Sequence, residues 1–251
     1  MNGAPILRIA MWSGPRNIST AMMRSFGARA DCAVTDEPFY AAYLIASGLI
    51  HPMRDEVIAS QPADWATVAA QMVGAPPEGK RVWYQKHMTH HMLPGFGRAW
   101  TDHVVNAFLI RQPSAVLASY ALKRDDFTLE EIGLPAQAEL FDRAADRLGR
   151  APPVVEAQDL LADPEGMLSA LCAALGLAFD PAMLTWAPGR RATDGVWAPV
   201  WYQSVERSTS FHSPRREVAF DELPDALKPI ADSAAPIYDR LAAHRLKPRP
   251  D

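Results

Sequence analysis

Arg111 and Ser119 are residues whose types and spacing suit the binding of a phosphate group. Within residues 107–120 an apolar, strand-like segment ends at Arg111, a proline turn follows, and a helix-like segment carries Ser119 eight positions later. An arginine guanidinium can donate two parallel hydrogen bonds to a phosphate, and a serine hydroxyl can donate another. We therefore expect an anion site at Arg111 and Ser119. A strand-end arginine paired with a carboxylate is the alternative interpretation.

A second anion-binding candidate lies near the N-terminus. Residues 6–12 are apolar, 13–16 read Ser-Gly-Pro-Arg, and 17–29 have helical spacing. The first N–H groups of a helix lack intrahelical partners and lie at the positive end of its dipole. The donors expected here are the N–H groups of Asn17, Ile18, Ser19 and Thr20, together with the Arg16 side chain. A Gly-Pro turn before an ordinary helix is the alternative.

Five short apolar segments must position these residues. The expected strands, residues 6–12, 32–35, 82–86, 108–110 and 154–155, alternate with helix-like stretches. This alternation predicts an α/β fold in which a central parallel sheet is flanked by helices in a three-layer sandwich. We expect one domain over residues 1–251. Residues 186–216 should be irregular and residues 223–246 helical.

Composition excludes several classes of protein. The 251 residues carry a net charge of −4, which argues against a general nucleic-acid binder. Cys32 and Cys172 are too few and too unpatterned for a disulfide scaffold or zinc site, so reduced thiols and no metal are expected. No signal peptide or membrane-spanning stretch is evident, which favours a cytoplasmic protein without a membrane partner.

The combination of the two anion segments resembles the sulfotransferase family that uses 3′-phosphoadenosine 5′-phosphosulfate (PAPS). The resemblance covers about residues 6–37, 82–123 and 153–176, and it is closest to divergent, bacterial-type members. The run Pro15-Arg16-Asn17-Ile18-Ser19-Thr20 is similar to the family's 5′-phosphosulfate loop, often Pro-Arg/Lys-Ser-Gly-Thr-Thr, but carries Ile18 where Gly is frequent. The resemblance implies a P-loop-type fold, PAPS as co-substrate, and Arg111 with Ser119 at the 3′-phosphate.

A late basic loop completes the donor site in many members of that family. Arg215 and Arg216, in residues 213–216, are one candidate, and residues 189–191 are another. Neither matches the family closely. A solvated basic surface is the alternative interpretation.

Four residues are the expected catalytic groups: Glu37, His90, Lys86 and Arg16. Glu37 follows Arg16 by 21 residues, similar to the catalytic Glu of protein-tyrosine sulfotransferases. His90 lies where many cytosolic members carry a catalytic His, although the Lys-x-His spacing is not kept. Either residue could accept the acceptor's proton. Lys86 and Arg16 would stabilise the negative charge of the leaving group.

The prediction is a sulfotransferase that moves a sulfuryl group from PAPS to a hydroxyl or amine of a small-molecule acceptor. Aromatic residues are expected around the acceptor, with residues 186–202 as a lid. A phosphotransferase or nucleotide hydrolase is one alternative, disfavoured because the GxxxxGK[ST] pattern is missing. A non-enzymatic nucleotide-binding module of the same fold is the other. The sequence specifies no oligomeric state.

Overall fold

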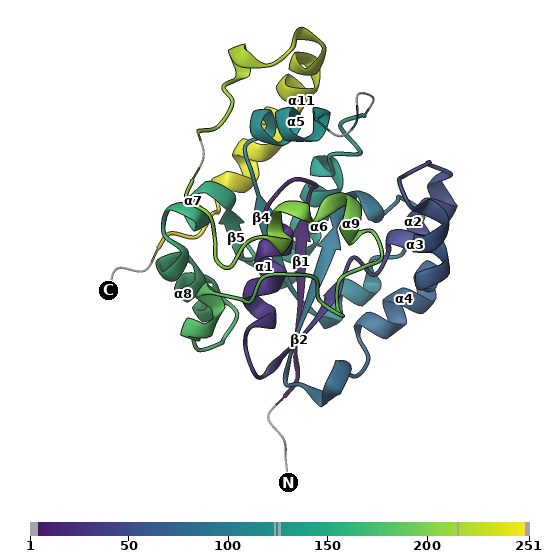
Figure 1. Cartoon of the computed structure of the whole chain (residues 1–251), viewed down its shortest axis with the longest axis vertical. Helices are drawn as coiled ribbons and strands as arrows, with labels where there is room; N and C mark the ends of the chain where they lie inside the picture. The colour runs from purple at the N-terminus through teal and green to yellow at the C-terminus, as the bar shows by residue number, and fades with distance from the viewer. Residues whose placement is uncertain (1–4, 123, 125–126, 215, 249–251) are drawn as a thin grey trace.

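A five-stranded parallel sheet forms the centre of the molecule (Figure 1). The computed structural model describes residues 5–122, 124, 127–214 and 216–248. The strand order is β2-β3-β1-β4-β5, and all pairings are parallel. The strands are β1 Leu7–Ser13, β2 Cys32–Asp36, β3 Val82–Met88, β4 Val105–Ile110 and β5 Val154–Glu156.

Helices follow or connect these strands. They are α1 Ser19–Gly27, α2 Tyr40–Ser47, α3 Arg54–Ser60, α4 Trp65–Met72, α5 Pro113–Ala121, α6 Leu134–Leu148, α7 Ala157–Ala162, α8 Pro164–Ala174, α9 Ala198–Trp201, α10 Gln203–Glu206 and α11 Lys228–Ala242. Single 3-10 turns lie at Pro77–Gly79, Thr89–His91, Ala99–His103, Pro181–Leu184, Phe220–Glu222 and Asp225–Leu227.

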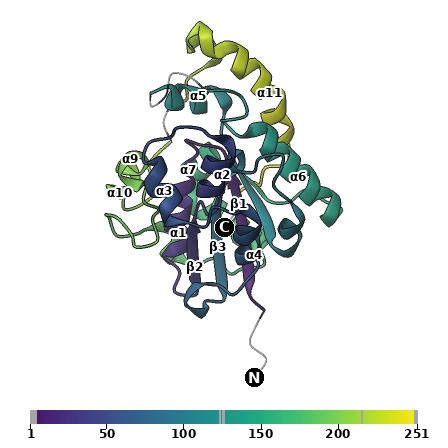
Figure 2. The same ribbon diagram turned by 90° about the vertical axis from the view of Figure 1, so that its right-hand side faces the viewer.

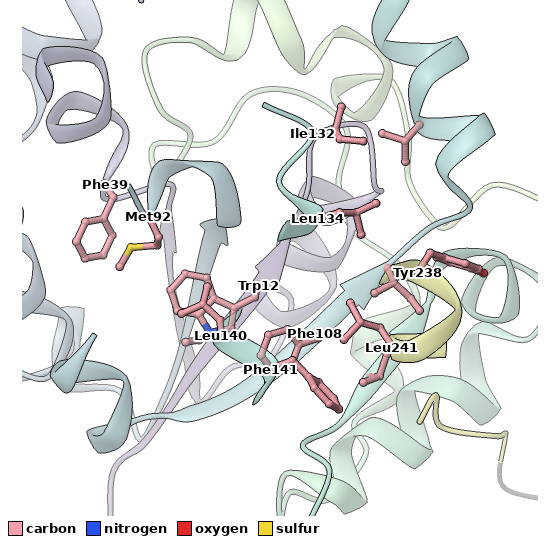
Figure 3. Close-up of a cluster of buried hydrophobic side chains, with 14 of the residues drawn as sticks. Trp12, Phe39, Met92, Phe108, Ile132, Leu134, Leu140, Phe141, Tyr238 and Leu241 are labelled. Atoms are coloured by element: carbon pink, nitrogen blue, oxygen red, sulfur yellow. The ribbon is translucent and has the colours of Figure 1, made fainter. Parts of the chain in front are cut away.

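Successive side chains of a strand point to opposite faces of the sheet, and here they pack into two separate hydrophobic cores. Ile9 and Met11 of β1 face the core that includes α1, α2 and α8, whereas Ala10 and Trp12 face the core that includes α4, α6 and α11. Figure 2 shows α6 and α11 together on one side of the molecule. Figure 3 shows Trp12, Phe108 and Phe141 within this second core. The result is three layers.

Strand register brings the polar strand ends to one edge. In the parallel pair β2–β3, Asp36 lies opposite Lys86, and in the pair β4–β5, Ile110 lies opposite Glu156. Because β1 lies between β3 and β4, the turn after β1 lies between Lys86 and the start of the segment that carries Arg111. Ligands of open parallel sheets bind outside the carboxyl ends of the strands, so this edge is where a site is expected.

The predicted fold class, an α/β sandwich on a parallel sheet, is confirmed. Two local expectations differ. Residues 186–216, expected to be irregular, contain the single-turn helices α9 and α10, and the C-terminal helix begins at Lys228 instead of residue 223. Pro224 and two 3-10 turns precede that helix, and a proline disfavours helical conformation in the residue before it.

Three further observations concern the described residues. Both cysteines there are free thiols and buried, as the sequence predicts. No described helix combines the length and the apolar character that crossing a bilayer requires. The described His, Cys, Asp and Glu residues form no group of three or more arranged to hold a metal ion.

Candidate active site

A pocket of about 560 Å³ opens at the carboxyl edge of the sheet. It gathers most of the described residues that the sequence marked for binding or catalysis: Arg16, Asn17, Ile18, Ser19, Thr20, Glu37, Lys86, His90, Arg111, Ser119 and Arg216. Arg215 lies outside the described residues. Residues from four strand ends and from the late segment after α10 therefore converge on one cavity.

The turn after β1 has an unusual backbone. Arg16 and Ile18 both have positive φ, 58° and 41°. Gly14 is required by crowding, because a Cβ there would lie 2.4 Å from the backbone oxygen of Ile132. A β-branched residue in the left-handed region is strained, and such strain concentrates at functional sites. Ile18 thus has a left-handed backbone of the kind that glycine adopts without strain.

The helix that follows this turn leaves its first donors available. No side chain caps the N-terminus of α1, and its first intrahelical-type bond runs from the Met22 N–H to the Ile18 carbonyl. The first residues of this helix, Ser19, Thr20 and Ala21, line the pocket. Uncapped N–H groups at the positive end of a helix dipole form an anion site.

The two anion segments are joined by direct hydrogen bonds. Arg16 donates through Nε to Ser119 Oγ at 2.9 Å, and Arg111 donates through Nη1 to the Arg16 carbonyl at 2.9 Å. Burial and the charge of Arg111 lower the pKa of Arg16 from its ordinary value. Arg111 is 3.6 Å from Glu217 Oε1, whereas Arg16 has no carboxylate partner among the described residues. This side of the pocket therefore holds two neighbouring cations, Arg16 and Arg111, and one carboxylate, Glu217, that pairs with Arg111.

Across the pocket, Lys86 sits in a buried polar cluster. Its ammonium donates to Asp36 Oδ1 at 2.9 Å, to Glu37 Oε1 at 2.5 Å and to the Tyr202 hydroxyl at 2.6 Å. The Lys86 side chain is 1% exposed. An ammonium has three N–H donors, so all three are in use.

The charges in this cluster control one another. Burial raises the pKa of Glu37, and Asp36 raises it further, while Lys86 opposes both effects. Burial acts to lower the pKa of Lys86, but Asp36 and Glu37 outweigh it and raise that pKa above its ordinary value. Lys86 is consequently a cation, and Glu37 is a carboxylate whose basicity exceeds that of an exposed glutamate.

Three histidines form the wall beside Glu37. His51 Nδ1 forms a hydrogen bond with the Tyr40 hydroxyl at 2.9 Å, and His51 Nε2 lies 3.1 Å from Arg124 Nη1. An arginine can only donate, so His51 Nε2 is the acceptor and Nδ1 carries the proton. Burial lowers the pKa of His51 to about 4 and of His90 to about 3, and lowers that of His91 well below its ordinary value. This wall is uncharged at neutral pH.

The two candidates for the late basic loop differ in position. Arg216 lines the pocket, but its side chain is 80% exposed and pairs with Glu222 at 2.5 Å. Residues 189–191 are not among the residues that line the pocket. Arg191 instead donates to the Ala187 carbonyl at 2.7 Å. The structure thus favours the later segment as a pocket wall.

Sequence reasoning missed three residues here. The sequence assigns no role to Asp36, yet Asp36 contacts Lys86 and Tyr202. Its signal was available, since a carboxylate beside Glu37 at a parallel strand end must meet the end of the neighbouring strand. Tyr202 lies at the end of the segment expected as a lid, residues 186–202, without a role of its own. Glu217 lies in no recognisable motif, and its ion pair with Arg111 carries no sequence signal.

Comparison with known proteins identifies the family to which the chain belongs. The model of the sulfotransferase domain family matches residues 7–244. The chain belongs to the sulfotransferase family. A sulfotransferase from Alicyclobacillus acidocaldarius has the same fold, with a TM-score of 0.51 and 14% identity over 97% of both chains. The sulfotransferase domain of the Synechococcus PCC 7002 olefin synthase matches at 19% identity, with a TM-score of 0.49 over 95% of both chains.

Two curated relatives come from Arabidopsis thaliana. They are branched-chain-amino-acid aminotransferase-like proteins 1 and 2, which are 34% and 32% identical over 236 residues. The match covers 94% of this sulfotransferase-family chain. The chain spans 42% and 41% of the length of these two relatives.

Proposed function

We propose that this sulfotransferase-family protein transfers a sulfuryl group from PAPS to a hydroxyl or amine of a small-molecule acceptor. The observation that carries the proposal is the pairing of Arg16 and Arg111 at the uncapped N-terminus of α1. Arg16 and Arg111 are half-buried neighbours, and the one carboxylate beside them, Glu217, pairs with Arg111 at 3.6 Å, so an anionic ligand would balance the remaining positive charge. PAPS carries phosphate groups at both ends of its ribose, which suits two linked anion sites.

The residues present fit this donor. Arg16 and the N–H groups after Ile18 would hold the 5′-phosphosulfate, and Arg111 with Ser119 would hold the 3′-phosphate. Arg216 is the proposed further contact from the late segment. The strained Ile18 supports this assignment, because the turn keeps the glycine-like conformation that lets backbone N–H groups approach a phosphate closely.

Glu37 is the proposed base. As the acceptor oxygen or nitrogen attacks sulfur, its proton passes to Glu37, and the bond between sulfur and the bridging oxygen breaks. The raised pKa of Glu37 brings its basicity closer to the operating pH, which favours general base catalysis. His90 is the weaker candidate because burial holds its pKa near 3, although it lines the same pocket.

Arg16 and Lys86 have different capacities to stabilise the leaving group. The terminal nitrogens of Arg16 have no hydrogen-bond partner among the described residues, so they are available to a ligand. All three donors of Lys86 are engaged, so Lys86 must exchange one partner before it can donate to the bridging oxygen. We therefore propose that Arg16 contacts the leaving group directly, and that Lys86 does so only after it has exchanged one of its partners.

The two plant relatives are named aminotransferase-like, but the pocket of this chain does not favour transamination. Pyridoxal phosphate enzymes bind their cofactor through a lysine imine, which needs an unprotonated amine. Lys86 is the lysine that lines the pocket among the described residues, and two carboxylates keep it protonated. The relatives are also more than twice as long as this chain.

A transfer assay tests the proposal. Purified protein is incubated with ³⁵S-labelled PAPS and a panel of hydroxyl and amine acceptors. We expect a labelled product, and Glu37→Gln should lower kcat by about 10²–10⁴-fold, as loss of a general base does. Glu139→Gln, which alters an exposed carboxylate paired with Arg98, is the matched control. Donor binding without transfer to any acceptor would instead identify a non-enzymatic module, and turnover of ATP or GTP would identify a nucleotide hydrolase.

A further inference from the structure

The Tyr202 hydroxyl lies at the centre of the buried cluster around Lys86. It accepts from Lys86 Nζ at 2.6 Å and from Trp197 Nε1 at 3.0 Å. It lies 2.8 Å from both carboxylate oxygens of Asp36 and 3.3 Å from Glu37 Oε1. A phenol has one proton and two lone pairs, so the two accepted bonds and one donation to a carboxylate satisfy it completely.

The segment that carries Tyr202 is fastened to the sheet edge at several points. Asp194 and Arg24 form a buried ion pair at 2.5 Å, and the Gly195 N–H donates to Asp36 Oδ2 at 3.0 Å. The Gly195 position has no room for a side chain, because a Cβ there would lie 2.1 Å from the Trp197 ring. The hydroxyl of Tyr202 is therefore held in place from its own segment as well as from the sheet.

We propose that Tyr202 is a positioning residue for the proposed transfer: its hydroxyl holds the Lys86 ammonium and the Asp36 carboxylate in a geometry that keeps Glu37 ionised. The inference rests on the proposed function for its role in catalysis. Of the three partners of Lys86, Tyr202 is the uncharged one. Lys86 can exchange it for a ligand oxygen at lower cost than either carboxylate, because both carboxylates would then be left buried without their counter-ion.

The direction of the effect on Glu37 follows from the groups that face it. These groups are Asp36, Lys86, Tyr202, His91, Tyr40 and Tyr120, the last of which is uncharged because burial raises its pKa. His91 and Tyr40 are uncharged, Asp36 raises the pKa of Glu37, and Lys86 and Tyr202 lower it. The single Tyr202 proton lies nearer Asp36, at 2.8 Å, than Glu37, at 3.3 Å, so removal of the hydroxyl leaves the Asp36 charge less compensated, and we expect the pKa of Glu37 to rise.

The test compares two tyrosine-to-phenylalanine variants. Tyr202→Phe removes the central hydroxyl. Tyr84→Phe is the matched control, since Tyr84 lies on the same strand as Lys86, is fully buried, and its hydroxyl has no hydrogen-bond partner among the described residues. Two quantities are measured in each protein. One is the pKa of Glu37, from ¹³C NMR titration of glutamate-labelled protein assigned with Glu37→Gln, and the other is the dependence of kcat on pH.

In Tyr202→Phe we expect the pKa of Glu37 to rise by about one unit, as loss of one hydrogen bond to a charged group implies. The acidic limb of the kcat profile should move to higher pH by the same amount, with little change in the KM for PAPS. Tyr84→Phe should leave both unchanged. Where Tyr202→Phe does not fold, Tyr202→3-fluorotyrosine keeps the ring and strengthens the donor, so the shift should have the opposite sign.

The outcomes separate the two proposals. An unchanged Glu37 pKa in Tyr202→Phe overturns the positioning role, whether or not the wild-type protein transfers sulfuryl groups. If the pKa of Glu37 rises in Tyr202→Phe but the wild-type protein transfers no sulfuryl group, the link from Tyr202 to Glu37 is supported and the proposed function is rejected. A fall in kcat with no shift of the pH profile also overturns the inference, because a merely structural tyrosine would produce that result.

Discussion

The Arg111 guanidinium donates to the backbone carbonyl of Arg16 at 2.9 Å, although 95 residues separate the two in the chain. Arg16 in turn donates to Ser119, which follows Arg111 on α5. The turn after β1 and the segment after β4 are therefore one unit, and the side chain expected to bind one end of the donor also fixes the loop expected to bind the other.

Replacement of Arg111 should consequently affect both ends of a bound donor. Arg111→Ala is expected to weaken binding of 3′-phosphoadenosine 5′-phosphate by about 10–100-fold, the loss of one or two hydrogen bonds to a charged group. Binding of 5′-AMP should weaken much less, because it lacks the 3′-phosphate. Isothermal titration measures both, with the exposed Arg240→Ala as control. Equal losses for the two nucleotides would contradict a 3′-phosphate site at Arg111.

Gly14 should tolerate no side chain. The Cβ of Gly14→Ala would lie 2.4 Å from the Ile132 carbonyl oxygen, which is backbone and cannot rotate away. We expect a loss of about 1–3 kcal/mol of unfolding free energy, typical of overpacking, and weaker nucleotide binding as the loop moves. Gly95→Ala, where a Cβ meets nothing within 4 Å, is the control in urea unfolding. Equal stabilities would show that the close approach is not rigid.

A pair of variants can measure the energetic cost of the left-handed backbone at Ile18. Ile18→Ala and Ile18→Gly remove nearly the same side chain, but only alanine keeps the penalty for positive φ. The glycine variant should be more stable by about 1 kcal/mol. At Ala70, on the exposed face of α4, Ala70→Gly should destabilise by a similar amount because helices disfavour glycine. A less stable Ile18→Gly in thermal and urea unfolding would show that no strain is stored there.

Buried neutral histidines should make the protein less stable in acid. His87 is 2% exposed and stacks on Trp12, and burial lowers its pKa to about 3. An unfolded histidine titrates near 6.5, so between about pH 6.5 and 3 the unfolded state binds the extra proton and the unfolding free energy falls as pH falls, by up to about 1.4 kcal/mol per pH unit. His87→Gln should reduce this slope in urea unfolding between pH 7 and 5. The exposed His103→Gln controls for the substitution, and an unchanged slope in His87→Gln would contradict this account.

The sequence predicted the parts of the site that depend on local order. Arg111, Glu37 and Lys86 each end or follow a short apolar run, and parallel strands bring such ends to one edge regardless of the details of packing. The turn at residues 13–16 and the helix after it could be recognised because the turn residues and the helical spacing are contiguous. These features need only strand period and helix start signals.

The contacts between distant segments could not be predicted in this way. Tyr202 meets Asp36 across 166 positions, and its partner was set by how residues 194–206 pack over the sheet edge. The short helices α9 and α10 depend on the same packing, since single turns have almost no stability of their own. Lys86 was expected to face a ligand, and only the tertiary structure reveals that three partners already occupy its donors.

The most direct test is isothermal titration of the purified wild-type protein with 3′-phosphoadenosine 5′-phosphate, with ATP and 5′-AMP titrated in parallel. Two linked anion sites predict micromolar binding of the bisphosphate, about −8 kcal/mol, and much weaker binding of the other two nucleotides. Equal affinities for all three would contradict the central claim, because Arg111 and Ser119 would then contribute nothing to recognition of the 3′-phosphate.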